Sequence, residues 1–117
     1  EGPASREEIV KQVKSYITAN LQEELRIEFL AKKFFLSADY LSRLFKKEEG
    51  IGIGDFILEE RMFLARELLK EGRLSIARVA YECGYDNYSY FTKIFKKKYG
   101  MTPREYGQVL KEKESAD

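Results

Sequence analysis

Residues 39–51 read DYLSRLFKKEEGI and residues 89–101 read SYFTKIFKKKYGM, which is one pattern repeated at an offset of 50 residues. Upstream of it, IEFLA in residues 27–31 pairs with IARVA in residues 76–80, at an offset of 49. The second copy therefore has one more residue between its two halves than the first. A repeat of this kind indicates that one structural unit is used twice.

Each copy is predicted to be a helix, a tight turn and a second helix. Such a unit needs a small residue where its two helices cross, and Ala31 and Ala80 meet that need. The turn needs a residue that tolerates a positive φ, which Gly84 provides in the second copy, whereas the first copy has Phe35 and Leu36 there. Apolar anchors on the second helices are Leu41, Leu44, Phe45, Phe91, Ile94 and Phe95.

Capping residues and apolar periodicity predict about seven helices and an all-α fold. Neither unit can bury a core alone, so the flanking helices are expected to complete the packing. We expect a first subdomain in residues 1–54, a long connecting helix in 55–71 and a second subdomain in 72–117. In the first subdomain, helices are predicted after a Ser5 cap, over residues 25–34, and from a Ser37 cap to residue 49. The connecting helix is predicted over residues 55–70. In the second subdomain, helices are predicted from a Ser75 cap to residue 83, from an Asp86 or Asn87 cap to residue 99, and from Thr102-Pro103 onward.

Composition narrows the function classes. The chain of 117 residues has no histidine and one cysteine, Cys83, which leaves few routes to catalysis or to transition-metal binding. We therefore expect a protein that is not an enzyme and needs neither cofactor nor metal. There is no apolar run long enough to span a bilayer, so we expect no membrane association. A single cysteine cannot form an internal disulfide, so we expect a reducing, cytoplasmic location.

Net charge is only +1, which is low for a nucleic-acid-binding domain, but the charge is unevenly distributed. Residues 1–30 contain four basic and six acidic side chains, and residues 91–117 contain seven basic and four acidic ones. Residues 87–104 contain five basic side chains and no acidic one. Basic charge is thus concentrated where the second helix of the second copy is predicted.

The pattern resembles the AraC/XylS family of bacterial transcription regulators from about Ile9 to Tyr106. The resemblance implies sequence-specific binding of promoter DNA, more often for activation, with two recognition helices in successive major grooves. It also implies RNA polymerase as a partner, and a separate sensing domain or phosphorylated receiver in the full-length protein. The motifs that carry it are Arg61, Ala65, Leu68-Leu69, Ser75-Ile76, Val79-Ala80, Gly84-Tyr85, Ser89-Tyr90-Phe91, Phe95-Lys96-Lys97, Gly100, Thr102-Pro103 and Glu105-Tyr106.

The sequence departs from the family pattern at several points. Gly107 follows the last tyrosine of the motif where an arginine is common, and Cys83 stands where an aliphatic residue is usual. Gly52 and Gly54 are expected to loosen the entry to the connecting helix.

Residues of the recognition helices that face away from the core are expected to read bases. Arg43 can bind guanine, phosphate or a nearby acid such as Asp39. For Asp39 itself, a role as a helix cap is favoured over a role as a cytosine reader. Tyr88 is a DNA contact or an exposed packing residue. The full set of base-contact candidates is Ala38, Asp39, Ser42, Arg43, Asn87, Tyr88, Ser89, Thr92 and Lys93.

A second group of side chains is expected to bind phosphate or to solvate helix ends, where cations also offset the helix dipole. These are Lys46, Lys47, Lys96, Lys97 and Lys98. Tyr40 and Tyr90, which match across the repeat, are expected in the core, as are Cys83, Tyr85 and Tyr106. Two other functions stay open: a helical protein-interaction module, and a DNA-binding accessory domain of a larger enzyme.

Overall fold

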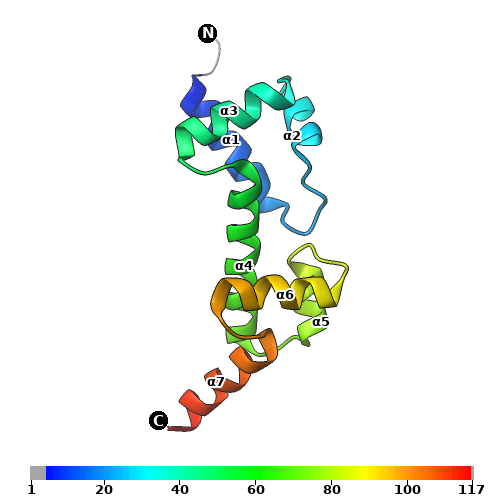
Figure 1. Cartoon of the computed structure of the whole chain (residues 1–117), viewed down its shortest axis with the longest axis vertical. Coiled ribbons are helices and arrows are strands. Elements are labelled where there is room, and N and C mark those ends of the chain that lie inside the picture. The colour runs from blue at the N-terminus through cyan, green and yellow to red at the C-terminus, as the bar shows by residue number, and fades with distance from the viewer. Residues whose placement is uncertain (1–4, 117) are drawn as a thin grey trace. The chain divides into compact units, whose positions relative to one another are not determined.

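The computed structural model describes residues 5–116, and all the regular structure in that range is helical, which confirms the all-α prediction. The chain divides into two compact units, Glu1–Glu60 and Arg61–Asp117, and helix α4 contributes residues to both. The helices are α1 (Arg6–Ala19), α2 (Ile27–Lys33), α3 (Ala38–Glu49), α4 (Ile53–Glu71), α5 (Ile76–Glu82), α6 (Tyr88–Tyr99) and α7 (Pro103–Ala116) (Figure 1).

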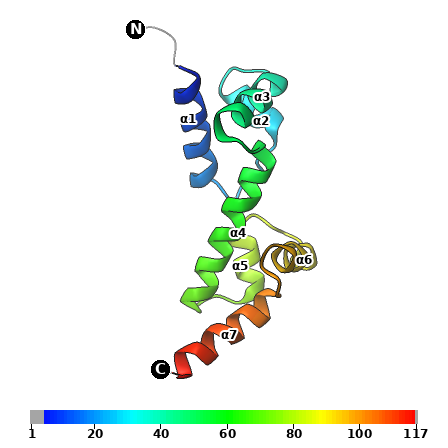
Figure 2. The same cartoon turned by 60° about the vertical axis from the view of Figure 1, so that its left-hand side comes forward.

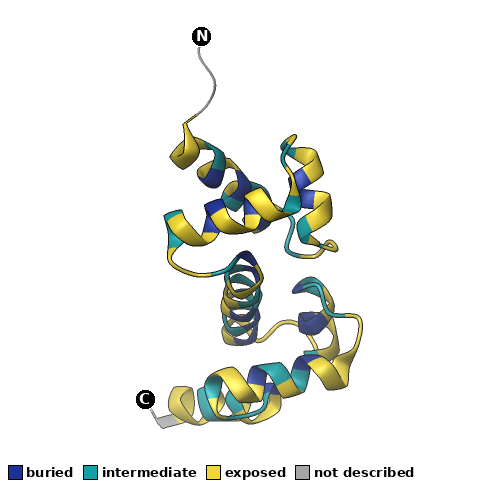
Figure 3. Ribbon diagram, turned by 45° about the horizontal axis from the view of Figure 1, so that its top comes forward, coloured by how far each residue is buried: buried dark blue, intermediate teal, exposed yellow. Residues whose placement is uncertain are grey.

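In the first unit, α3 packs against both α1 and α2. Val10, Val13 and Ile17 line one face of α1 at helical spacing and are buried, whereas most charged residues of α1 are exposed. Figure 3 shows this separation of buried and exposed residues on the helices. The buried core of the unit is Val10, Val13, Ile17, Leu30, Ala31, Leu41, Leu44, Phe45, Ile53 and Ile57.

The helix boundaries follow local capping chemistry. The hydroxyl of Ser37 accepts a hydrogen bond from the backbone N–H of Tyr40 at 3.1 Å, and Gly50 ends α3 with φ of 83°. In the second unit the Asn87 side chain caps α6 by accepting from the N–H of Tyr90 at 3.0 Å, which decides between Asn87 and Asp86. These bonds satisfy donors that a helix terminus would otherwise leave unpaired.

Two predicted boundaries were wrong by two residues. Helix α2 begins at Ile27 rather than residue 25, because Arg26 is extended and acts as the N-cap residue. Helix α4 begins at Ile53 rather than residue 55, because the carbonyl of Gly52 already accepts from the N–H of Phe56 at 3.0 Å. Gly54 therefore lies inside the first turn of α4.

The turns of the two helix-turn-helix units have the same hydrogen-bond pattern. In the first, the N–H of Leu36 donates to the carbonyl of Ala31 at 2.8 Å, and in the second the N–H of Tyr85 donates to Ala80 at 2.9 Å. Leu36 and Tyr85 still match at the offset of 49, whereas the caps Ser37 and Asn87 match at 50. The additional residue of the second copy is therefore Asp86, which precedes the α6 cap. The longer second turn predicted from the repeat is confirmed.

The second unit packs α5, α6 and α7 with the second half of α4 (Figure 2). Its centre is aromatic: the Phe95 ring lies 6.0 Å from Phe91, 4.8 Å from Tyr99 and 5.8 Å from Tyr106 between ring centroids. The buried residues of this unit include Met62, Ala65, Leu69, Val79, Ala80, Cys83, Phe91, Phe95 and Pro103.

Helix α7 begins at Pro103 with a reciprocal pair of hydrogen bonds. The Thr102 N–H donates to Glu105 Oε1 at 2.8 Å, and the Glu105 N–H donates to Thr102 Oγ1 at 3.1 Å. Hydrogen bonds from Thr102 to the Glu105 carboxyl lower the pKa of that carboxyl, first from the Thr102 backbone and then from its hydroxyl. Proline at the first helical position loses no hydrogen bond, because its N–H would have no partner in the helix.

Candidate nucleic-acid interface

Helix α3 buries its apolar face and exposes a polar one, as expected of a recognition helix. Leu41, Leu44 and Phe45 are buried. Asp39, Ser42, Arg43, Lys46 and Lys47 are exposed on the other side of the helix. The packing of α3 on α1 and α2 thus holds this polar face toward solvent.

The Arg43 side chain is available to a ligand. Its Nε donates to the backbone carbonyl of Asp39 at 3.4 Å, a long bond along the same helix, and no salt bridge in residues 5–116 includes Arg43. The predicted alternative of a pair with an acid such as Asp39 is therefore not formed. Asp39 lies in the first turn of α3, where its negative charge interacts favourably with the helix dipole. The cap of α3 is Ser37 rather than Asp39.

Helix α6 repeats this arrangement in the second unit. Phe91 and Phe95 are buried, whereas Tyr88, Ser89 and Lys93 are exposed. Asn87, also exposed, uses its side-chain oxygen as the α6 cap, and this leaves its amide nitrogen as a donor.

Two candidate side chains are less accessible than predicted. Ala38 is half-buried and packs against the core of the first unit. Thr92 is half-buried as well, and its hydroxyl oxygen is buried without a hydrogen-bond partner among the described residues. Only the apolar part of Thr92 can therefore meet a ligand without a change of rotamer, whereas Ser42, its match in the first unit, is exposed.

The lysines at the C-terminal ends of the two helices are all exposed. In the part of the chain that the structure describes, no salt bridge includes Lys46, Lys47, Lys96 or Lys97. Lys98 is exposed beside them. Each group lies in the last turn of its helix, where cations also stabilise the dipole.

The expectation that Tyr40 and Tyr90 are core residues was wrong. Tyr40 is 37% exposed and Tyr90 is 56% exposed. The Tyr90 ring lies on the outside of the unit, 6.0 Å from the half-buried Tyr85 ring, because each of these tyrosines precedes a buried anchor by one residue. Both side chains are therefore exposed beside the polar faces of α3 and α6.

Tyr85 and Cys83 are packing residues, as predicted. The Tyr85 ring lies 5.8 Å from Phe91, and the Arg61 guanidinium lies over it at 5.4 Å. Burial raises the pKa of Tyr85, and Arg61 partly opposes this. Burial also raises the pKa of the Cys83 thiol to about 12, which keeps it protonated and unreactive. Tyr106 is likewise half-buried against Phe95.

Arg6 joins the polar face of α3 and was not among the predicted site residues. A shallow hollow of about 250 Å³ in the first unit is lined by Arg6, Tyr40, Arg43, Leu44 and Lys47. Three of these five side chains are cationic and none is acidic, so the hollow favours an anion. Arg6 is 37 residues before Arg43 in sequence, so only the packing of α1 on α3 brings them together.

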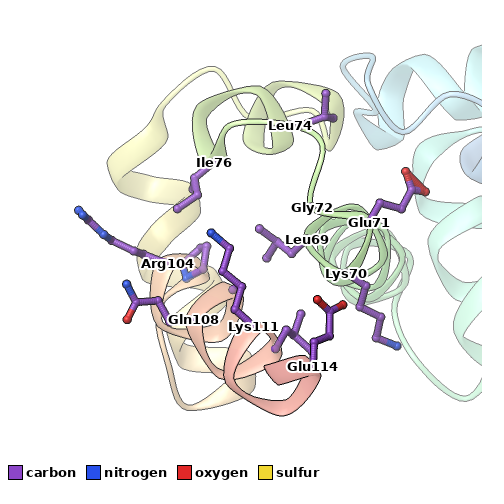
Figure 4. Close-up of a pocket in the computed structure, with 13 residues that line it drawn as sticks. Leu69, Lys70, Glu71, Gly72, Leu74, Ile76, Arg104, Gln108, Lys111 and Glu114 are labelled. Carbon is purple, nitrogen blue, oxygen red and sulfur yellow. The ribbon is translucent and has the colours of Figure 1, made fainter. Parts of the chain in front are cut away.

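A larger pocket of about 490 Å³ lies elsewhere in the second unit, between the end of α4, the start of α5 and α7. Figure 4 shows Leu69, Ile76 and Lys111 from these three helices pointing toward one another. Acidic and basic side chains are both present in its lining, and none of the predicted DNA contacts lines it.

Comparison with known proteins places this geometry in a family. The family described as "Helix-turn-helix domain" matches residues 30–108. Regulatory protein PocR of Salmonella typhimurium is 40% identical over 111 residues, which are 95% of this chain and 37% of PocR. The chain thus spans a little over a third of the length of this curated relative.

Solved structures of transcription regulators have the same fold as this chain. The C-terminal domain of AraT, a response regulator from Geobacillus stearothermophilus, has a TM-score of 0.83 and 35% identity, with 86% of this chain and 84% of that chain covered. A transcriptional regulator with an AraC-type DNA-binding domain from Chromobacterium violaceum has a TM-score of 0.78 and 28% identity, with 87% and 91% covered. The chain therefore belongs to the AraC/XylS family of helix-turn-helix transcription regulators.

Proposed function

We propose that this chain regulates transcription by binding double-stranded promoter DNA in a sequence-specific manner, with α3 and α6 in successive major grooves. The observation that carries the proposal is the repetition of one exposed cationic pattern on both helices. Arg43, Lys46 and Lys47 on α3 correspond to Lys93, Lys96 and Lys97 on α6, and all are exposed. Buried anchors on the opposite face hold each set in place.

We assign base recognition to exposed side chains in the first two turns of each helix, which enter the groove most deeply in helix-turn-helix proteins. Arg43 has a free guanidinium edge that matches the two acceptors of guanine. Lys93 is its match on α6. Asp39, Ser42, Asn87, Tyr88 and Ser89 complete the set, whereas the half-buried Ala38 and Thr92 contribute at most apolar contacts.

We assign phosphate binding to Lys46, Lys47, Lys96, Lys97 and Lys98. Arg6 adds a cation from α1, because it lines the same hollow as Arg43 and Lys47. Contacts of this kind fix the position of a protein on the duplex and make affinity dependent on salt, but they carry no sequence information.

We propose that the domain is the output part of a longer regulator with a sensing or receiver domain, since the chain spans only 37% of PocR and AraT is a response regulator. We propose RNA polymerase as the partner of the DNA-bound regulator. We expect the regulator to act at promoters in the cytoplasm and to activate transcription.

Among the described residues, none of the helices combines the length and the apolar content that crossing a membrane requires.

The near-neutral net charge of +1 is the observation that favours a protein-interaction module instead. Selection from random duplex DNA separates the two functions, followed by binding measurements at several salt concentrations. We expect one enriched sequence and an affinity that falls steeply with salt, because phosphate contacts release counterions. Failure to enrich any sequence, with no salt-dependent binding, would favour the interaction module.

A further inference from the structure

Phe35 has two unusual properties in the turn between α2 and α3. Its backbone is left-handed, with φ of 60°, and among non-glycine residues in the described range it alone has a positive φ. Its side chain is also 95% exposed. A bulky residue in this conformation is a genuine outlier, and such outliers are concentrated at functional sites.

The turn itself does not require a phenylalanine. The equivalent residue in the second unit is Gly84, with φ of 91° and the same hydrogen bonds around it. Glycine adopts this conformation without strain. Packing does not explain the ring of Phe35 either, since nearly all of it is in contact with solvent.

The position of Phe35 indicates a partner. It is two residues before Ser37, the cap of α3, so its Cα lies within about 7 Å of the cap residue. Its N–H donates to the carbonyl of Lys32 at 3.2 Å, so Phe35 belongs to the same turn as the exposed residue Lys32. An exposed apolar ring in the turn between Lys32 and the N-terminus of a recognition helix suits the edge of a DNA groove.

We propose that Phe35 is a DNA contact of the first helix-turn-helix unit, and that its ring packs on the apolar surface of the duplex beside α3. That surface consists of thymine methyl groups and deoxyribose carbons. The inference rests on the proposed function, and extends the interface to a residue outside both recognition helices. Lys32 and the N-terminus of α3 would hold the flanking phosphates.

The test compares variants on the duplex selected with the parent chain. Phe35→Gly removes the ring but keeps the backbone that Gly84 has, and we expect binding about tenfold weaker. The slope of affinity against salt should stay unchanged, since an apolar contact releases no counterion. Phe35→Tyr keeps the ring and should bind like the parent, as should Phe63→Ala, which removes a phenylalanine of α4 that is 54% exposed.

Deoxyuridine in place of thymidine distinguishes the two apolar surfaces. If the ring packs on a methyl group, one such replacement should weaken the parent and leave Phe35→Gly unaffected. If the ring packs on deoxyribose, no single replacement should weaken the parent in this selective way. Phe35→Gly should still bind more weakly than the parent. Both results support the contact.

A folded Phe35→Gly chain that binds like the parent would overturn the inference. Circular dichroism melting checks folding, and Phe35→Asn, another side chain that tolerates positive φ, serves as the second variant. A parent chain that binds no duplex at all is a different result, because it contradicts the proposed function itself. The parent control thus separates the two failures.

Discussion

Phe35 and Gly84 occupy the same position in the turns of the two helix-turn-helix units, with φ of 60° and 91°. Left-handed backbone costs an L-residue about 1 kcal/mol or more, whereas glycine adopts it freely. The first turn therefore carries a strain that the second turn avoids.

Exchanges at these two positions should have opposite effects on stability. We expect Phe35→Gly to raise the free energy of unfolding by about 1 kcal/mol, and Gly84→Ala to lower it by a similar amount. Urea denaturation followed by circular dichroism measures both. A large loss of stability in Phe35→Gly would show that the ring is packed rather than exposed.

Ala80 should not tolerate enlargement, because it is 1% exposed and its carbonyl accepts the turn hydrogen bond from Tyr85. We expect Ala80→Leu to destabilise the second unit by about 1–3 kcal/mol and to abolish specific binding, with some salt-sensitive nonspecific binding retained. Ala77→Leu is the matched control, since Ala77 is exposed on the same helix. Equal melting temperatures for the two variants would argue against a tight crossing of α5 and α6 at Ala80.

Specificity and affinity should separate between Arg43 and Lys97. Arg43→Ala should weaken binding by about 1–3 kcal/mol and relax preference at one or two base pairs. Lys97→Ala should weaken specific and random duplexes alike, and reduce the salt slope by about one. Repeating the DNA selection with each variant checks this, and a changed sequence preference in Lys97→Ala would show that this lysine reads bases.

Stability should fall at alkaline pH because of Cys83. Burial raises the pKa of this thiol from 9.0 to about 12, so between those values the unfolded chain loses a proton that the folded chain keeps. The contribution is complete below pH 9 and is lost as pH rises toward 12. Relative to Cys83→Ala, we expect the parent to lose on the order of 1 kcal/mol per pH unit in this range.

The same unfolding titration of parent and Cys83→Ala provides the check, because Tyr85, whose pKa burial also raises, is present in both chains. A constant difference between them from pH 8 to pH 11 would mean that the thiol is accessible to solvent. Alkylation by iodoacetamide under native conditions would lead to the same conclusion.

Helix ends could be predicted from the sequence because capping is local chemistry. Ser37 and Gly50 bound α3 as expected, since their preferences depend on a few neighbouring backbone groups. Exposure on the helix faces was harder to predict. Tyr40 and Tyr90 each precede a buried anchor by about 100° of helix rotation, and the match between the copies indicated a shared environment without showing which one.

Features that arise from tertiary packing could not be predicted from the repeat. The hydroxyl of Thr92 is buried and Ser42 is exposed, although the two residues match in sequence. Arg6 reaches the hollow beside Arg43 only because α1 packs on α3. The left-handed backbone of Phe35 follows from the turn geometry that both copies share and not from its own preference.

We propose that both recognition helices of one chain read one duplex. Hydroxyl-radical footprinting of the selected site, with the parent, Arg43→Ala and Lys93→Ala, tests it most directly. We predict an asymmetric site bound by a monomer, with two protected segments about one helical turn apart, roughly 34 Å. Arg43→Ala should weaken protection in one segment and Lys93→Ala in the other. Protection of a single segment, or binding restricted to palindromes by a dimer, would contradict the account.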